Sequence, residues 1–416
     1  MTRATAPGPG GTTFTIDDEL LAPDFATSAA LPASAPVRIA YAAAHVVMRP
    51  EYARLPHSSA SPGDPSTIAA HVDLEATLAV RRRLDALGFG IAEAMDTAQR
   101  FEIGWPLASR LIETCGRAQL AQGFVAGASA DHVSPPRDSA ALAAAVAEQC
   151  GRIRSAGGTP VILPMPALVA WGVDATVYVD VYRRIVEATQ GPLLVHWLGP
   201  MFLAALQGYF PGDSFDAVMD LAPTRIIGCK LSLLDDAFEL RVRRRLLPRG
   251  QLVLTGDDFH FGTLMLGGPL QGGPLQGGRL QGSSVEGRAR WNGRDVAFGD
   301  FSHALLGILL GCARPASLAL RLLAQGETDR ARAILARCER LGQHVFEAPT
   351  SAYKAGLALI SWLDGWQDVF LLPNHAQRAR SVDHHLRTAQ LAAAAGVFRD
   401  AAFTAARLRE LVARGV

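Results

Sequence analysis

The chain has 416 residues, a formal net charge of +1 and 49% hydrophobic residues. A chain of this length holds either one large α/β barrel with an appendage or two ordinary domains. Its basic residues are scattered, so we expect neither a nucleic acid nor a membrane surface as a partner. Its longest apolar stretches, such as 303–311, are too short to span a bilayer.

Two further features indicate a cytoplasmic protein. The first thirty or so residues lack a basic stretch followed by an apolar core, so we expect no secretion signal. The five cysteines are odd in number, widely spaced and without a CxxC pair. This pattern favours reduced thiols over a disulfide framework or a zinc site. We therefore expect a soluble cytoplasmic protein.

The first predicted segment is a flexible N-terminal arm over residues 1–35, which are rich in Ala, Pro, Gly, Ser and Thr. Short apolar runs then alternate with helical patterns along most of the chain. The runs cover residues 37–41, 89–93, 123–126, 159–163, 192–196, 225–230, 251–255 and 301–306. Strands that alternate with helices in this way indicate a parallel sheet with helical crossovers.

Eight such strands predict an α/β fold, a TIM (β/α)8 barrel. A doubly wound sheet is the alternative, but no Gly-x-Gly-x-x-Gly motif follows the first strand. From about residue 312 the pattern is helical without strands. We therefore predict a barrel over residues 36–325 and a C-terminal helical region over residues 326–416.

An insertion at about 267–298 interrupts the alternation. Gly-Gly-Pro-Leu-Gln begins at Gly267 and again at Gly272, and Gly-Gly-Arg-Leu-Gln follows at Gly277. The composition favours a flexible expansion. The alternative is a mobile lid, because loops after barrel strands lie over the active-site face. Residues 288–298 contain an Asn-Gly pair between alternating residues, which predicts a small hairpin.

Lys230 is the leading candidate for chemistry, because Lys230 and Lys354 are the only lysines in the chain. A lysine in an apolar pocket can lose its proton and attack a carbonyl, whereas arginine stays protonated. Lys230 ends the predicted strand at 225–230, which is where a class I aldolase carries its Schiff-base lysine. The alternative is that this lysine merely escaped replacement by arginine.

From about residue 36 to 372 the chain resembles the dihydrodipicolinate synthase / N-acetylneuraminate lyase family of class I aldolases. Ile-Ile-Gly-Cys-Lys at 226–230 resembles that family's strand ending in Gly-x-Lys, and Thr-Gly-Asp-Asp at 255–258 resembles the motif at the end of the next strand. Residues 353–359, followed by Leu-Leu-Pro at 371–373, resemble its C-terminal helix and Leu-Pro stop. Asp-Leu-Glu-Ala-Thr-Leu from Asp73 and Leu-Gly-Phe-Gly-Ile from Leu87 resemble its first helix and second strand.

The resemblance implies a lyase that needs no cofactor and acts on an α-keto acid or a sugar acid by aldol cleavage, condensation or dehydration. Lys230 would form the Schiff base, and Asp258 or a neighbour would orient the polyol part of the substrate. Lys354 would have a structural role in the C-terminal region.

His196 takes the place of the tyrosine that this family usually has at the end of strand five. A histidine can relay protons near neutral pH, so we expect His196 to act as the general acid and base. A local hydrogen bond is the alternative role for such a strand-end histidine.

Met-Asp-Thr-Ala-Gln at 95–99 takes the place of the family's Gly-Thr-Thr-Gly-Glu, which holds the carboxylate of the keto acid. Thr97 can still donate a hydroxyl, but Asp96 would repel a carboxylate unless it faces away or binds a sugar hydroxyl. Arg100 pairs with an acidic substrate group in one interpretation and is a solvated helix residue in the other.

Further polar residues lie at predicted strand ends, which meet on one face of a barrel. They are His45, Asp131, His132, Asp257, Asp258, His260, Ser302 and His303. Of these we expect Asp257, Asp258 and His260 to bind substrate.

Such a group could also hold a divalent metal in a metal-dependent aldolase or sugar isomerase, but no HxH or HExxH spacing supports a metal, so we expect none. A barrel that only binds a metabolite is a third possibility. The apolar helix at 357–366 indicates a homo-oligomer, a dimer or tetramer, unless it packs on the barrel.

Overall fold

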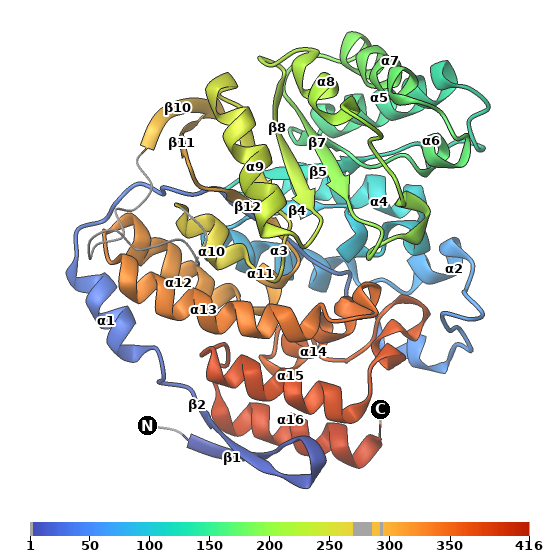
Figure 1. Cartoon of the computed structure of the whole chain (residues 1–416). Coiled ribbons are helices and arrows are strands. Elements are labelled where there is room, and N and C mark those ends of the chain that lie inside the picture. The colour runs from blue at the N-terminus through green and yellow to red at the C-terminus, as the bar shows by residue number, and fades with distance from the viewer. Residues whose placement is uncertain (1–2, 269–284, 292–293, 416) are drawn as a thin grey trace.

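The computed structural model describes residues 3–268, 285–291 and 294–415. Eight parallel strands form a closed barrel in the order β12-β3-β4-β5-β6-β7-β8-β9 (Figure 1). Their bounds are β3 Ala40–Ala43, β4 Gly90–Glu93, β5 Phe124–Ala128, β6 Thr159–Ile162, β7 Leu193–Leu198, β8 Ile226–Ser232, β9 Leu252–Thr255 and β12 His303–Leu306. All eight predicted strands are confirmed, and the first begins at Ala40 rather than at residue 37. Most of their side chains are buried, as expected for parallel strands covered on both sides.

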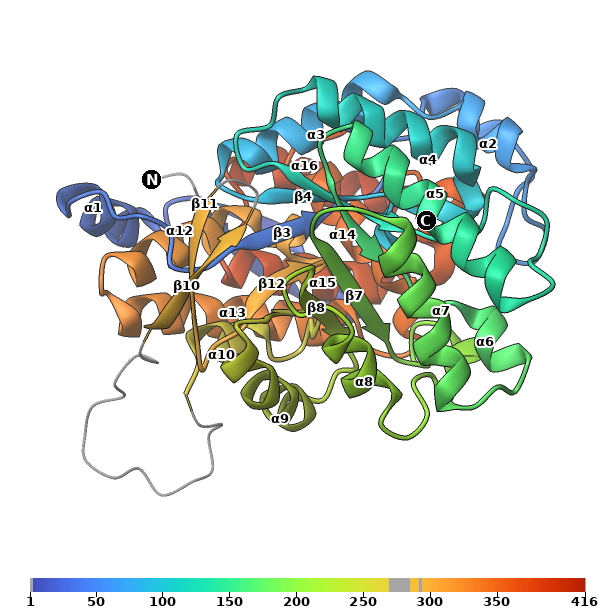
Figure 2. The ribbon, with the colours of Figure 1, turned by 90° about the horizontal axis from the view of Figure 1, so that it is seen from above.

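Helices surround the barrel and connect its strands (Figure 2). They are α2 Pro65–Ala70, α3 Leu74–Ala86, α4 Arg100–Arg117, α5 Ser139–Ser155, α6 Pro166–Ala170, α7 Ala175–Ala188, α8 Ser214–Asp220, α9 Asp236–Leu246 and α10 Phe261–Leu266. Asp73, Asp138, Asp174 and Asp235 each stand immediately before a helix and accept a backbone N–H of its first turn. These caps fix where four of the crossover helices begin.

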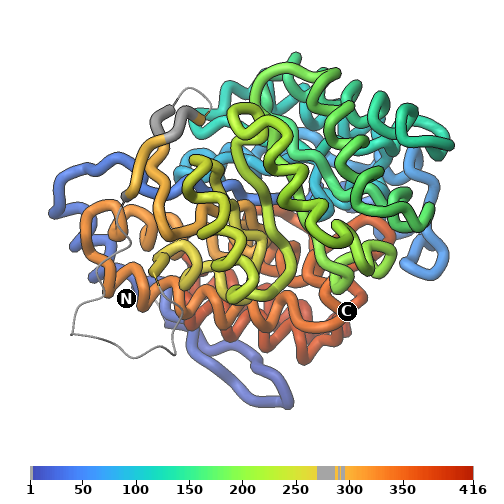
Figure 3. The backbone as a smooth tube through the Cα atoms, turned by 45° about the horizontal axis from the view of Figure 1, so that its top comes forward, coloured from blue at the N-terminus to red at the C-terminus, as the bar shows by residue number. Residues whose placement is uncertain are grey.

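The C-terminal helices lie next to one another on one side of the molecule, as the red part of the chain trace in Figure 3 shows. After β12 come α11 Ile308–Gly311 and α12 Ala313–Ala324, and the predicted helical region at 326–416 contains α13 Thr328–Val345, α14 Tyr353–Leu363, α15 Val382–Ala394 and α16 Ala401–Arg414. A Cβ atom on Gly342 of α13 would lie 2.1 Å from the backbone oxygen of Asp258, so only glycine lets this helix approach the loop after β9. Every residue of α14 is buried within the chain itself. This helix therefore packs inside the protein and does not offer the oligomer interface considered for it.

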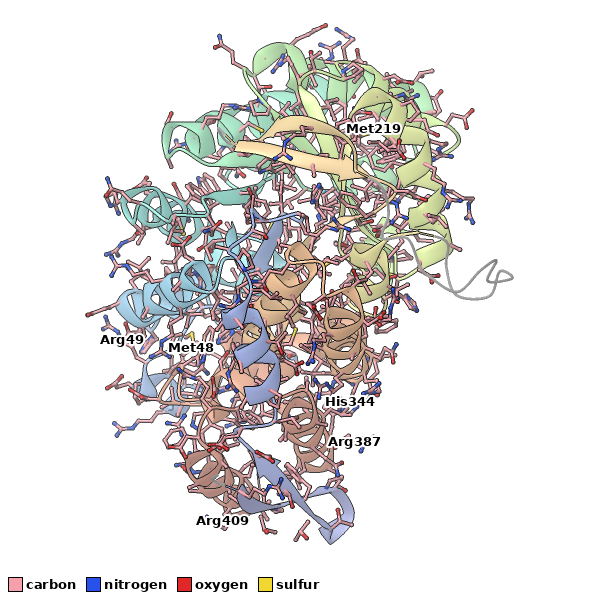
Figure 4. The ribbon with its side chains drawn as sticks, turned by 90° about the vertical axis from the view of Figure 1, so that its left-hand side faces the viewer. Met48, Arg49, Met219, His344, Arg387 and Arg409 are labelled. Carbon is pink, nitrogen blue, oxygen red and sulfur yellow. The ribbon has the colours of Figure 1, made fainter. Side chains whose placement is uncertain are left out.

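The N-terminal segment is ordered, contrary to the prediction of a flexible arm. It forms an antiparallel hairpin of β1 Arg3–Pro7 and β2 Thr13–Asp17, followed by α1 Ala22–Ala30. Ile16 and Leu21 are fully buried, and Arg409 of α16 donates to the backbone oxygen of Thr5 at 3.5 Å (Figure 4). The amino-acid composition of the N-terminal segment is typical of a flexible chain. Its few apolar side chains nevertheless pack into the core of the C-terminal helices.

The insertion contains the predicted hairpin, formed by β10 Val285–Trp291 and β11 Arg294–Gly299. The Asn-Gly turn and the repeat at 269–284 lie outside the described residues. Because the insertion follows α10 and precedes β12, its described ends lie where the barrel strands begin. Trp291 is buried there, and its Nε1 donates to the hydroxyl of Tyr41 at 2.6 Å. The lid hypothesis assumed that this segment follows a strand directly and so lies at the carboxyl ends of the strands. The described ends of the insertion lie at the amino ends instead.

Within the described part of the chain, no helix is both long and apolar enough to cross a membrane. All five cysteines are buried and free.

Candidate active site

A cavity opens at the carboxyl ends of the barrel strands, and both the barrel and the C-terminal region contribute to it. The loop after β4, the ends of β7, β8 and β9, and α14 all reach this cavity. Its polar lining residues are Asp96, Thr97, His196, Lys230, Ser232, Asp258 and Tyr353. Five of the predicted site residues, Lys230, His196, Asp96, Thr97 and Asp258, therefore lie together.

Lys230 lies in β8, with His196 of β7 as its neighbour in the sheet register. Burial lowers the pKa of Lys230 to about 8, against the opposing charges of Asp258 and Asp96. A lysine with such a pKa has a far larger neutral fraction near neutral pH than an ordinary lysine, although the ammonium form still predominates. A Cβ atom on Gly256 would lie 2.1 Å from Ser232 Oγ and 2.8 Å from Lys230 Cε, so the glycine of the Thr-Gly-Asp-Asp motif makes room for both side chains.

Asp258 stands beside this lysine and is held by the backbone. Its Oδ1 accepts the N–H of Ile308 at 2.9 Å, at the start of α11. Burial raises the pKa of Asp258 to about 7, although Lys230 and the backbone hydrogen bonds act in the other direction. Near neutral pH the Asp258 carboxylate is therefore partly protonated, and the Lys230 amine is partly deprotonated.

His196 is buried and reaches the cavity from the adjacent strand. Its Nε2 lies 3.2 Å from Ser232 Oγ, and its Nδ1 has no hydrogen-bond partner among the described residues. Burial, reinforced by the charge of Lys230, holds the pKa of His196 well below its usual value. The imidazole is therefore neutral at pH 7, and its buried Nδ1 is without a partner among the described residues.

A second polar group joins the loop after β4 to α14. The hydroxyl of Tyr353 donates to Asp96 Oδ2 at 2.9 Å and lies 2.8 Å from Thr97 Oγ1. Lys354 Nζ lies 2.9 Å from the same Asp96 oxygen. Lys354 thus compensates the charge that would repel a substrate carboxylate. Burial raises the pKa of Tyr353 well above its usual value, so the phenol keeps its proton.

Tyr353 and Ser232 also line the cavity and were not among the predicted site residues. Tyr353 belongs to a helix that reaches the cavity only through tertiary packing, more than 250 positions from Thr97 in the chain. The sequence did contain one indication, because the only other lysine of the chain follows Tyr353 directly.

Arg100 does not line the cavity, contrary to its prediction as a substrate ligand. Its side chain is fully buried and binds Asp131 through two nitrogens, with the shorter distance at 2.7 Å. It also donates to the backbone oxygen of Gly127 at 2.6 Å. Arg100 therefore ties the loops after β4 and β5 together and has no free donor pair for a substrate acid.

Asp257 and His260 also lie outside the cavity lining. Asp257 Oδ1 accepts the backbone N–H groups of Phe259 and His260, and its Oδ2 lies 2.9 Å from His260 Nδ1. This hydrogen bond raises the pKa of His260. The pair closes the turn that leads into α10, a structural role that accounts for both side chains.

The metal-dependent alternative needs several strand-end ligands to converge, and the structure separates them. His45 Nε2 is bound to Gln367, His303 Nδ1 accepts the N–H of Ile39, and Asp131 is paired with Arg100. Among the described residues, one group has atoms close enough for a shared ion, namely His344, Glu347 and His384. It joins α13 to α15 and does not line the cavity.

Comparison with solved structures finds the same barrel in several enzymes. Dihydrodipicolinate synthase from Agrobacterium tumefaciens is 16% identical, with a TM-score of 0.53, covering 86% of this chain and 98% of that one. Sialic acid aldolase from Ruminococcus gnavus is 11% identical, with a TM-score of 0.54 and coverage of 85% and 97%. Dihydrodipicolinate synthase from Cyanidioschyzon merolae, with lysine bound, is 12% identical, with a TM-score of 0.53 and coverage of 86% and 99%.

These similarities confirm the predicted resemblance at the level of the fold. A comparison with curated proteins finds no match. One family model matches residues 15–416, which is nearly the whole chain. The chain therefore belongs to the family described as "Protein of unknown function (DUF993)".

Proposed function

We propose that this protein is a class I aldolase or lyase that forms a Schiff base on Lys230 with an α-keto acid. The observation that carries the proposal is a lysine of lowered pKa in a cavity at the carboxyl ends of the barrel strands, beside a neutral histidine. A neutral amine is the form that attacks a carbonyl, and active sites of this fold lie at this end of the barrel.

In the proposed reaction, the Lys230 amine adds to the ketone carbon and forms a carbinolamine. Loss of water gives a protonated imine, which accepts the electron pair when the neighbouring carbon–carbon bond breaks. The enamine then takes up a proton, and hydrolysis releases the keto acid and the free amine. Condensation is the reverse of this path, and dehydration of a sugar acid would use the same imine as electron sink.

His196 is proposed as the main proton carrier, because it is neutral, adjacent to Lys230 and has an unpartnered ring nitrogen. A second path would run from Thr97 through Tyr353 to Asp96. Tyr353 gives its only hydrogen to Asp96, so Thr97 must donate to Tyr353 in this arrangement. These hydroxyls could carry a proton between the cavity and Asp96, whose side chain is 44% exposed.

The test is borohydride trapping of the imine. The protein is incubated with a panel of α-keto acids and sugar acids and reduced, and the adduct is located by peptide mass. We expect an adduct on Lys230 that Lys230→Arg abolishes. Lys354→Arg is the matched control, because it alters the only other lysine and should leave the adduct in place.

Absence of an adduct with every candidate, in a protein shown to be folded, would contradict the proposal. The metal-dependent reaction or a binding role would then be favoured. Loss of the adduct in both lysine variants would indicate that the assay reports folding and not imine formation.

A further inference from the structure

The lining of the cavity is divided by chemistry. Its polar side chains belong to the two groups described above, one around Lys230 and one around Tyr353. The other side chains of the described lining are apolar. They include Leu163, Leu198, Phe202, Leu203, Leu206 and Phe346. A ligand that extends beyond the reacting carbonyl therefore meets hydrocarbon on most sides.

Three aromatic rings form one continuous part of this lining. Phe346 stacks on Tyr353 with ring centroids 4.3 Å apart and an interplanar angle of 15°. Phe202 lies edge-on to both, at 6.4 Å from Phe346 and 6.3 Å from Tyr353. Such edge-on and stacked geometries are those in which a further aromatic ring is also favourable.

Apolar side chains are also exposed to solvent at and near the cavity. Phe101 and Leu203 line the cavity and remain 54% and 41% exposed, and Met201, two positions before Leu203 in the chain, is 39% exposed. Six large hydrophobic side chains are exposed in the described part of the chain, and these are three of them. Gathered exposed apolar residues around a cavity are typical of a ligand site.

A polyhydroxylated substrate fits this lining poorly. Each hydroxyl that leaves water needs a new hydrogen-bond partner, and an unpaired one is unfavourable. One oxygen of each carboxylate in the lining is already engaged, because Asp96 Oδ2 pairs with Lys354 and Asp258 Oδ1 accepts from Ile308. The apolar side chains that form the rest of the lining offer no partner to a row of hydroxyls, so the expectation that Asp258 orients a polyol is not favoured.

We propose that the substrate is a 2-oxo acid whose remote end is an aryl group, so that cleavage releases an aromatic aldehyde. This inference rests on the proposed Schiff-base function. With a 4-aryl-4-hydroxy-2-oxobutanoate, the C3–C4 bond breaks in the Lys230 imine, and His196 takes the proton of the C4 hydroxyl. The electron pair passes to the enamine, which is protonated at C3, and water releases pyruvate. The net reaction gives one aldehyde and one pyruvate, and no oxidant or metal is consumed.

The test compares two aldehydes in condensation with pyruvate, benzaldehyde and the polyhydroxylated aldehyde erythrose, with products followed by mass spectrometry. We expect kcat/KM to be at least about tenfold higher for benzaldehyde. Phe202→Asn should remove most of this preference while borohydride trapping of pyruvate on Lys230 is unchanged. Phe403→Asn is the control, since Phe403 is an exposed aromatic residue of α16 outside the cavity lining.

The possible outcomes separate the two proposals. Trapping of pyruvate on Lys230 together with a preference for erythrose, or with use of neither aldehyde, would overturn the aryl inference and leave the Schiff-base function standing. Failure of pyruvate and of 4-phenyl-2-oxobutanoate to be trapped would overturn the Schiff-base function itself. Binding of 4-phenyl-2-oxobutanoate, but not of 2-keto-3-deoxygluconate, to the Lys230→Met protein would support aryl recognition independently of turnover.

Discussion

The two lysines of this chain lie near the same cavity in opposite electrostatic settings. Lys354 has a carboxylate partner, Asp96, at 2.9 Å. Lys230 forms no ion pair among the described residues. The largest influence on its pKa is the loss of solvent around the buried amine. A buried amine without a close counter-ion favours its neutral form, whereas a paired amine favours the ammonium form. This difference assigns the nucleophilic role to Lys230 and a charge-compensating role to Lys354.

Imine formation on Lys230 should therefore follow a titration near pH 8. The trapped fraction, measured by peptide mass after brief exposure to pyruvate and cyanoborohydride, should rise through about pH 8 and level off. An ordinary lysine would keep gaining reactivity toward its pKa of about 10.4. Asp258→Asn should move the midpoint to lower pH, because the Asp258 carboxylate raises the pKa of Lys230 and the amide cannot. A midpoint that stays in place or moves upward would contradict this pairing.

Tyr353→Phe tests the hydroxyl path between Thr97 and Asp96. The variant keeps the ring that stacks on Phe346 but loses both hydrogen bonds of the hydroxyl. If the hydroxyl moves protons, kcat should fall by about 10²-fold, while trapping of pyruvate on Lys230 persists. Tyr178→Phe, a buried tyrosine outside the cavity, is the control. An unchanged kcat would leave Tyr353 as a packing residue only.

At the scale of elements, the eight barrel strands were predictable because each buried strand is a short apolar run between helical patterns. The N-terminal hairpin was not, since the composition of residues 1–35 favours a flexible chain, whereas the order of β2 depends on its packing against α15 and α16, far away in the sequence. The role of Arg100 depends in the same way on Asp131, 31 positions further on. The hydrophobic pattern within one element indicates whether it is a helix or a strand. It does not indicate which distant element it will pack against.

The β10–β11 hairpin is an element whose contribution can be measured. Trp291 is 2% exposed at the amino ends of the strands, where it packs with Tyr41, Leu252 and Leu305. Trp291→Ala should lower the free energy of unfolding by about 3–5 kcal/mol, as for other buried large-to-small changes. Trp291→Phe should cost less, because it keeps an aromatic ring and loses the hydrogen bond to Tyr41.

Urea denaturation measures the free energy of unfolding of Trp291→Ala and Trp291→Phe. Pyruvate trapping on Lys230 should be retained in both variants, because the hairpin lies at the other end of the barrel from the cavity. A loss below about 1 kcal/mol for Trp291→Ala would show that the hairpin is not part of the barrel core.

At the scale of the whole molecule, the barrel and the C-terminal region share buried polar contacts. His45, just beyond β3, is fully buried, and its Nε2 lies 2.5 Å from Oε1 of Gln367, beyond α14. Burial lowers the pKa of His45 to about 4, with the charge of Arg81 acting in the same direction. The neutral imidazole must therefore be the donor of this bond between the two regions.

This histidine should make the protein less stable in acid. Between pH 6.5 and about 4 the unfolded chain binds a proton at His45 that the folded protein excludes, so the free energy of unfolding falls as the pH is lowered through this window. A shift of this size corresponds to about 3 kcal/mol once the pH is below 4. His45→Gln keeps a donor for Gln367 but cannot titrate. Urea denaturation from pH 7.5 to 4 should show the wild-type protein losing stability relative to the variant, and parallel curves would contradict a buried neutral His45.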